Sequence, residues 1–364
     1  MDRSFSIYLD LVRFGAACLV YLYHSNQRAL TSEILPASNF GHSSVIVFFV
    51  LSGFVIAYVT DKKERTWTSY SASRLSRVYS VALPALVLTV LLDSVGRGLM
   101  PSLYGGYPYD RFAERLGAGF LMLNEWWFVS VTSFSNVPYW SIGYEFWYYA
   151  LFGIYVFLPS RLAWPVIVIL ALFLGPKVIL LAPIWAAGVA LYRWKALQRM
   201  PVGWASVVCL LSIAGIVGFH MLELEPLVTS WFKSLLGPEL HTQLTFSKFF
   251  MTDYLLGALV FVNFASMRVV APYLSGLFLA IERPVRYVAA YTFTLYLLHQ
   301  PLFLFWAAVL RGDPRGSLYW WQTTGLVMVS VLAIGYVTEN KRHALRRWLE
   351  QVFARAPTLF ARRA

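Results

Sequence analysis

The sequence predicts an all-α fold, a polytopic membrane bundle of about ten transmembrane helices with both termini in the cytoplasm. Of its 364 residues, 59% are hydrophobic and only 13% are charged, which is too few charges to cover a soluble surface. Apolar runs recur along the chain, and most approach the roughly 20 residues that a spanning helix needs. Basic residues gather between these runs. This composition excludes a disordered chain, a coiled coil and a disulfide-stapled secreted domain.

Ten segments are candidates for spanning helices. They cover residues 7–24, 43–60, 78–96, 138–158, 162–175, 178–192, 203–222, 249–266, 288–310 and 320–338. The fifth and sixth are short and are divided at Gly175-Pro176-Lys177. Merging them would put the two basic clusters on opposite sides of the membrane, against the positive-inside rule, so we expect two helices. The same argument favours an interfacial helix over 268–286 instead of an eleventh span.

The positive charge is segregated along the chain. The 30 Lys and Arg exceed the 18 Asp and Glu and give a net charge of +12. Such loop charge orients a multispanning protein, and no exposed basic fold remains for nucleic acid, so we expect no nucleic-acid partner. One membrane domain over 1–340 and a basic cytoplasmic tail over 341–364 are predicted. The two clusters are Lys62, Lys63, Arg65, Arg74 and Arg77 in one loop, and Lys341, Arg342, Arg346, Arg347, Arg355, Arg362 and Arg363 in the tail.

Neither the cysteines nor the N-terminus indicates a secreted or metal-binding protein. Cys18 and Cys209 each lie inside an apolar run, so we expect no framework disulfide and no metal site. The first apolar run is interrupted by Asp10 and Arg13 and has no small-residue cleavage site after it. We therefore expect a retained first helix in place of a signal peptide.

Two long loops are predicted on the outer side, over 97–137 and 223–248. The first is rich in aromatic residues, which suit either the membrane interface or stacking on a sugar ring, and the interface is the commoner role. These residues are Tyr104, Tyr107, Tyr109, Trp126 and Trp127.

Four ionisable residues stand where a membrane helix disfavours them: Asp10, Arg13, Glu145 and His299. A charge near the bilayer centre costs at least about 2.5 kcal/mol, so each is a functional-site hypothesis. His24 joins them because it follows Arg13 by eleven residues, almost a whole number of turns, so both project from one face about 16 Å apart. Asp10 is placed to pair with Arg13. The alternative is that this pair locks two helices together and that His24 lies in the headgroup zone.

Several motifs follow one another in a distinctive order. They are Asp10 with Arg13 and His24, FFVLSGF over 48–54, RLSRVY over 74–79, WSIGYE over 140–145 and TFTLYLLH over 292–299. Together they resemble the acyltransferase-3 family, integral membrane acyltransferases that decorate extracytoplasmic carbohydrates in bacteria. The resemblance covers nearly the whole chain. Ser80 stands where the family usually has Pro, and Leu11 where it usually has Gly, so these departures affect local backbone shape and leave the charged groups in place.

The resemblance implies transfer of an acyl group, usually acetyl, from cytoplasmic acyl-coenzyme A to a sugar hydroxyl outside the bacterial inner membrane. Acetyl-coenzyme A is then the expected donor, and no metal is needed. An exopolysaccharide repeat unit, O-antigen, glycolipid or other lipid-linked oligosaccharide fits as acceptor. Arg74 and Arg77, placed where the third helix meets the cytoplasm, suit the phosphates of coenzyme A, which guanidinium binds bidentately. Their alternative role is positive-inside anchoring.

Arg13, His24 and Glu145 are the candidate catalytic residues. We expect Arg13 to contact the polar portion of the donor and His24 to meet the thioester as a general base. Glu145 is expected near the depth of His24, where it would orient the imidazole or stabilise its cation. Two alternatives remain open. His24 can act as a nucleophile that carries the acyl group, and Glu145 can be a protonated packing residue.

Lesser candidates complete the predicted site. Tyr296 and His299 share a helix face and are expected to line the donor channel, with a packed core histidine as the alternative. Ser52 and the adjacent Gly53 permit close helix approach, and the Ser52 hydroxyl is a candidate donor contact. Trp140 and Tyr148 are candidate acceptor contacts, although Tyr148 also suits the bundle wall.

The main rival function is a transporter or flippase for a polar or lipid-linked solute, because polar residues in a helix bundle also mark translocation paths. Such proteins often show inverted repeats and helices broken at corresponding positions, and the sequence shows neither clearly. A non-enzymatic scaffold would leave the buried charged residues without a purpose. The enzyme is therefore the favoured interpretation.

Overall fold

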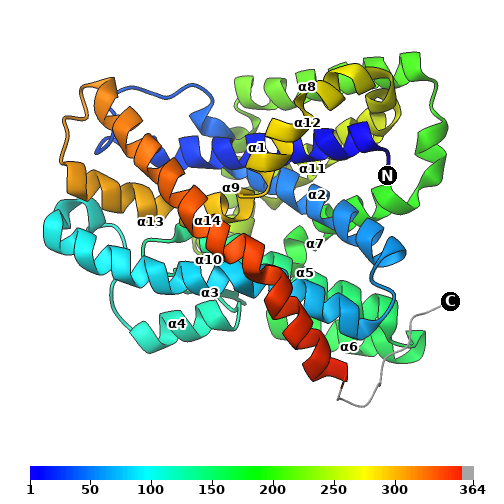
Figure 1. The fold of residues 1–364 in the computed structure, drawn as a ribbon, viewed down its shortest axis with the longest axis horizontal. Coiled ribbons are helices and arrows are strands. Elements are labelled where there is room, and N and C mark those ends of the chain that lie inside the picture. Colours follow the sequence, from blue (N-terminus) through cyan, green and yellow to red (C-terminus); the bar gives the residue numbers. More distant parts are fainter. Residues whose placement is uncertain (355–364) are drawn as a thin grey trace.

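The computed structural model describes residues 1–354 and is almost entirely helical (Figure 1). This confirms the all-α bundle predicted from the sequence, and each of the ten predicted segments corresponds to one long helix. The ten helices are α1 (Arg3–Ser25), α2 (Gly41–Lys62), α3 (Trp67–Leu99), α5 (Trp140–Phe157), α6 (Ser160–Leu174), α7 (Pro176–Arg193), α8 (Val202–Met221), α11 (Phe250–Val270), α13 (Thr292–Leu310) and α14 (Ser317–Ala354).

Eight helical segments within residues 1–354 are long and apolar enough to cross a membrane. Of the ten helices above, α5 and α6 are outside this set. The α5 helix is rich in Trp and Tyr, and α6 has only 15 residues. The count of ten spans and the cytoplasmic location of both termini therefore stay predictions.

The segments predicted as long loops are folded. Residues 97–137 and 223–248 contain α4, a two-stranded hairpin, α9 and α10, and the helix expected near 268–286 is α12, which packs along α1. The elements are α4 (Phe112–Phe120), β1 (Glu125–Trp126), β2 (Val129–Ser130), α9 (Leu224–Leu236), α10 (Pro238–Gln243) and α12 (Ser275–Ala289), with 3-10 turns at Ser38–Phe40, Pro101–Tyr104, Val137–Tyr139, Lys195–Arg199, Thr245–Phe249 and Ala271–Leu274.

The bundle has two ends, which α1 connects. The start of α1 and the turn between α2 and α3 lie at one end, on the right of Figure 1, which we call the N-terminal side. The last turn of α1 and the start of α2 lie at the opposite end, which we call the far side. Because α1 and α2 pack antiparallel, residues early in α1 lie near the N-terminal side and residues late in α1 lie near the far side.

Helix α3 begins eleven residues before the predicted span at 78. The Thr66 side chain caps it by accepting a hydrogen bond from the Ser69 amide at 3.2 Å. Arg74 and Arg77 therefore lie inside a helix, and the prediction that they belong to a loop is wrong. The last helix likewise runs past the boundary predicted at 340 as far as Ala354, and the predicted tail residues Arg355, Arg362 and Arg363 lie outside the described residues.

Helices α2 and α7 touch through their backbones. A Cβ atom on Gly53 would stand 2.0 Å from the carbonyl oxygen of Trp185, and one on Gly188 would stand 2.0 Å from that of Val50. This confirms the prediction that Gly53 permits close helix approach. The contact also fixes Trp185 beside Ser52, to which its indole nitrogen donates a hydrogen bond of 3.2 Å.

We predict that Gly188→Ala destabilises the protein by about 1–3 kcal/mol, because the added methyl group must push two backbones apart. Thermal unfolding of the purified protein in detergent should show a clear drop in Tm. Gly325→Ala is the matched control, since a Cβ atom on that helical glycine meets nothing within 4 Å. Equal melting temperatures for the two variants would contradict the close packing of α2 and α7.

Candidate active site

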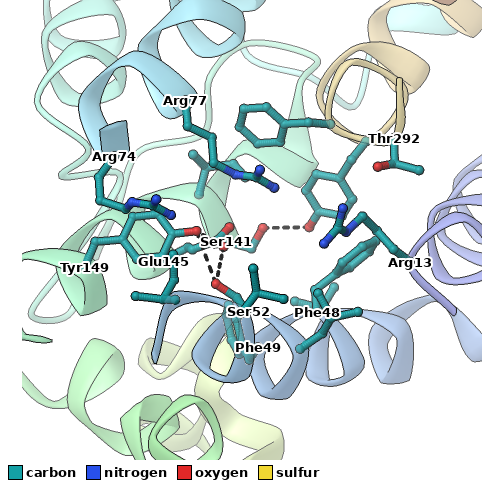
Figure 2. Close-up of a pocket in the computed structure, with 17 residues that line it drawn as sticks. Arg13, Phe48, Phe49, Ser52, Arg74, Arg77, Ser141, Glu145, Tyr149 and Thr292 are labelled. Carbon is teal, nitrogen blue, oxygen red and sulfur yellow. Dashed lines mark hydrogen bonds between the residues drawn. The ribbon is translucent and has the colours of Figure 1, made fainter. Parts of the chain in front are cut away.

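A cavity of about 70 Å³ inside the bundle gathers three arginines and one carboxylate (Figure 2). Arg13 reaches it from α1, Arg74 and Arg77 from α3, and Glu145 from α5. The remaining wall is mostly apolar and includes Phe48 of α2. We call this space the arginine cavity. Among its described lining residues, three guanidinium groups stand against one carboxylate, a balance that would suit an anionic ligand.

Glu145 is held by hydroxyl groups at the floor of the arginine cavity. The Ser52 hydroxyl donates to its Oε1 atom at 2.5 Å, and the Tyr149 hydroxyl donates to the same atom (Figure 2). Trp185 donates in turn to Ser52, as described above. The structure therefore places Ser52 and Glu145 together, which the sequence predicted only as separate candidates.

Arg74 is buried and already paired. Its Nη2 atom lies 2.5 Å from Glu64, a buried carboxylate in the turn between α2 and α3. The guanidinium carbon also lies 5.7 Å from the ring centre of Tyr70 and 5.8 Å from that of Tyr149. An anionic ligand that binds Arg74 must compete with Glu64. Sequence reasoning missed Glu64 because it falls among the loop charges.

Arg13 belongs to a ladder of charges that ties α12 to α1. The predicted pair is confirmed, since Arg13 donates to Asp10 at 3.3 Å. Asp10 also accepts from Arg286 at 2.8 Å, and Arg286 contacts Glu282 at 2.8 Å. Glu282 then pairs with Arg3 at 2.6 Å. Sequence reasoning missed the contacts of Glu282 and Arg286, which come from a helix more than 250 residues away along the chain.

His24 lies in a second pocket of about 560 Å³, which we call the far-side pocket. Arg13 and His24 share the uninterrupted helix α1, as predicted, and each lines a different pocket. The predicted pairing of Glu145 with His24 is wrong, because Glu145 lines the arginine cavity with Ser52 and Tyr149 as its partners. Similar depth along two helices does not bring the two side chains together, because it leaves the direction in which each projects undefined.

His299 stands between the two pockets. Its ring centre is 5.2 Å from that of His24 and 6.3 Å from that of Tyr296, and Tyr296 lines the arginine cavity. The Nδ1 atom lies 3.0 Å from the Leu295 carbonyl oxygen, which can only accept, so Nδ1 carries a hydrogen. In the neutral ring Nε2 is then an acceptor, and it is buried without a hydrogen-bond partner within residues 1–354.

A side-chain bridge supports the segment of α13 that carries His299. Pro301 has no amide hydrogen, so the carbonyl of Leu297 loses its usual partner within the helix. The Asn136 amide replaces that partner and donates to the Leu297 oxygen at 2.7 Å. Next to it, Ser135 donates to Asp93 of α3 through both its amide, at 2.9 Å, and its hydroxyl, at 2.5 Å. Sequence reasoning did not find this bridge.

The proposed acceptor contacts Trp140 and Tyr148 line neither pocket. The Trp140 ring stacks on Phe246 with centres 4.3 Å apart. The Tyr148 hydroxyl donates to the Val178 carbonyl at 2.6 Å. These contacts favour the bundle wall over a ligand site. Their motif neighbour Ser141, in contrast, lines the arginine cavity and bonds to the Tyr296 hydroxyl at 2.6 Å.

A family model described as an acyltransferase domain matches residues 6–339. The chain belongs to the acyltransferase-3 family. Arg13, His24, Arg74, Arg77 and Glu145 all lie within the matched residues of this acyltransferase-3 chain, and the resemblance drawn from the motifs is confirmed.

One curated relative is "Acyltransferase MdmB" of Streptomyces mycarofaciens, which is 28% identical over 166 residues. That alignment covers 42% of this chain and 41% of the relative, so the chain spans less than half of the relative's length. No solved structure matches the chain.

We predict that Asn136→Leu lowers the free energy of unfolding by about 1–3 kcal/mol, because it leaves the buried Leu297 carbonyl unsatisfied. Pro301→Ala restores the missing amide donor, so the double variant should lose clearly less than the sum of the two single variants. Thermal unfolding of all three variants beside the wild type measures this coupling. Additive losses would show that Asn136 does not replace the proline's missing hydrogen bond.

Proposed function

We propose that this protein is an O-acyltransferase of the bacterial inner membrane. It would transfer an acyl group, with acetyl the first candidate, from cytoplasmic acyl-coenzyme A to a hydroxyl of an extracytoplasmic carbohydrate. Family membership supports the reaction class. We base the proposal on α1, which places a guanidinium in the arginine cavity and an imidazole in a separate polar pocket nearer the far side.

The arginine cavity is suited to the donor. Coenzyme A carries several phosphate groups, and Arg13, Arg74 and Arg77 offer guanidinium groups to bind them. By the positive-inside rule the N-terminal side, with its basic turn between α2 and α3, faces the cytoplasm. Phosphates would enter from there and displace Glu64 from Arg74. The pantetheine arm would then extend past Tyr296 and His299 towards His24.

His24 performs the proton transfer in this proposal. The acceptor hydroxyl oxygen attacks the thioester carbonyl carbon, so a C–O bond forms and the C–S bond breaks. The hydroxyl proton passes to His24 and then to the leaving coenzyme A thiolate, which departs as a thiol. In the alternative order His24 first takes the acyl group itself and passes it to the acceptor. An acyl-protein adduct isolated without acceptor would identify this second route.

Glu145 and His299 have supporting roles in this mechanism. Glu145 faces the arginine cavity, so its carboxylate offsets part of the guanidinium charge and fixes the cavity wall through Ser52. It acts on the donor side and does not orient His24. His299 has its Nδ1 hydrogen committed to the backbone, and its unpartnered Nε2 can accept a hydrogen from the His24 ring after a small rotation. We assign His299 a positioning role.

We predict that Arg77→Gln weakens acetyl-coenzyme A binding at least about tenfold, because a hydrogen bond between two charged groups contributes about 1.5–3 kcal/mol. Titration calorimetry of the protein in nanodiscs measures the affinity. Arg193→Gln is the matched control. Arg193 is the last residue of α7, donates to the Tyr155 hydroxyl of α5 and does not line the arginine cavity. Equal affinities for the two variants would remove the donor from this cavity.

The reaction itself is tested with radiolabelled acetyl-coenzyme A and the purified protein in nanodiscs, by measuring hydrolysis or transfer to added carbohydrates. We expect His24→Ala to lose about 100-fold or more of the wild-type rate, the usual contribution of a general base, with its Tm and donor affinity retained. An equally active His24→Ala would refute the assigned role. If the wild type neither binds nor turns over acetyl or longer acyl-coenzyme A, a transporter or flippase becomes the better proposal.

A further inference from the structure

The far-side pocket has a composition unlike that of the arginine cavity. Its walls come from the end of α1, the 3-10 turn before α2, the loop after α3 and the middle of α13. Asn26, Gln27, Tyr107 and Gln300 supply amide and hydroxyl groups around His24. Among the described residues that line it, none is Asp, Glu, Lys or Arg. Its volume of about 560 Å³ lies within the usual range of small-molecule sites.

We propose that the far-side pocket is the acceptor site and that it selects a neutral, hydroxyl-rich ligand, a sugar residue without a carboxylate or phosphate. Tyr107 and Gln300 are its selecting groups. This inference rests on the proposed acyltransferase function. It adds the charge class of the acceptor and names the residues that would bind it. The sequence pointed instead to Trp140 and Tyr148, which pack elsewhere.

Unused hydrogen-bonding capacity at the pocket wall supports this assignment. The Tyr107 oxygen accepts hydrogen bonds from the Gln27 amide at 3.2 Å and from the Gln300 amide at 3.0 Å. Both of these partners donate, so the Tyr107 O–H remains available to donate to a ligand. Gln300 is only 2% exposed, and its Oε1 has no hydrogen-bond partner within residues 1–354.

An adjacent donor and acceptor of this kind match a carbohydrate. A sugar hydroxyl both donates and accepts, so one hydroxyl of a neighbouring pair can accept from Tyr107. The other can donate to the Gln300 oxygen after a side-chain shift that brings this buried atom to the pocket surface. A site built to hydrogen-bond a hydroxyl discriminates strongly against ligands that lack it. The two side chains therefore supply recognition that the apolar walls of the bundle do not.

The position of these groups fits acyl transfer. Gln300 directly follows His299, whose ring lies beside His24. Gln27 donates to the His24 backbone carbonyl at 2.9 Å as well as to Tyr107. A sugar held by Tyr107 and Gln300 therefore lies in the same pocket as the imidazole that must take its proton.

The absence of charged side chains from the described wall favours a neutral ligand. A buried anion is strongly unfavourable unless a cation or several donors pair with it. Arg97 lies outside the pocket lining. Its Nη2 donates to the Tyr107 backbone carbonyl at 2.7 Å, and its guanidinium carbon lies 4.7 Å from the ring centre of Tyr109. The carboxylate of a uronic acid would have no cation to pair with among the described residues that line the pocket, whereas a neutral hexose carries no charge.

The test uses the full chain in nanodiscs with neutral methyl hexosides as probes and the methyl glycosides of the matching uronic acids as anionic counterparts. Saturation-transfer NMR measures sugar binding, and labelled acetyl-coenzyme A measures transfer. We expect neutral glycosides to bind at least about tenfold more tightly than the uronates at pH 7. Tyr107→Phe, which removes one hydroxyl, should raise the acceptor Kd and KM about tenfold or more and leave acetyl-coenzyme A affinity unchanged.

Tyr109→Phe is the matched control, because Tyr109 lies in the same loop, donates to the Val90 carbonyl and does not line the pocket. Failure of the wild type to bind acetyl-coenzyme A would count against the proposed function. The acceptor inference fails separately if the donor binds but no neutral glycoside does, if uronates bind better, or if Tyr107→Phe behaves like the control. Thermal melts establish that each variant is folded, and Gln300→Leu provides a second variant with the same expected loss.

Discussion

Burying guanidinium groups inside an apolar bundle is the constraint on which the rest of this structure depends. Arg13 and Arg74 persist there because each lines the arginine cavity and has a carboxylate partner, Asp10 and Glu64 respectively. These partners come from the first helix and from the turn before α3, and the ladder beyond Asp10 reaches α12. Neutralising the arginines therefore also fixes where several helices pack.

The same constraint separates two chemical environments along one helix. Near the N-terminal side α1 contributes Arg13 to a cationic cavity, and near the far side it contributes His24 to a pocket of neutral amides and hydroxyls. His299 lies between them on α13, in a segment that Asn136 supports where Pro301 interrupts the helical hydrogen bonds. In the proposed function, a charged donor and a neutral acceptor enter from opposite ends and meet beside His24 and His299.

The sequence predicted the long helices, which follow from local composition. It also placed the candidate site residues Arg13 and His24 on one helix, which follows from their spacing. It misplaced Arg74 in a loop, since apolarity begins at residue 78 while the Thr66 cap starts the helix earlier. It paired Glu145 with His24 because depth along a helix does not give the direction of a side chain. It could not find the contact between Tyr107 and Gln300, which joins residues 193 positions apart.

Entry of donor and acceptor from opposite sides of the membrane is tested most directly by measuring transfer in proteoliposomes. The protein is reconstituted and its orientation is determined by protease access to its N-terminus. Labelled acetyl-coenzyme A and the acceptor sugar are then supplied on the same side or on opposite sides. We expect acetyl transfer only when the donor is on the N-terminal side and the sugar is on the far side. Equal transfer with both on one side would contradict entry from opposite sides.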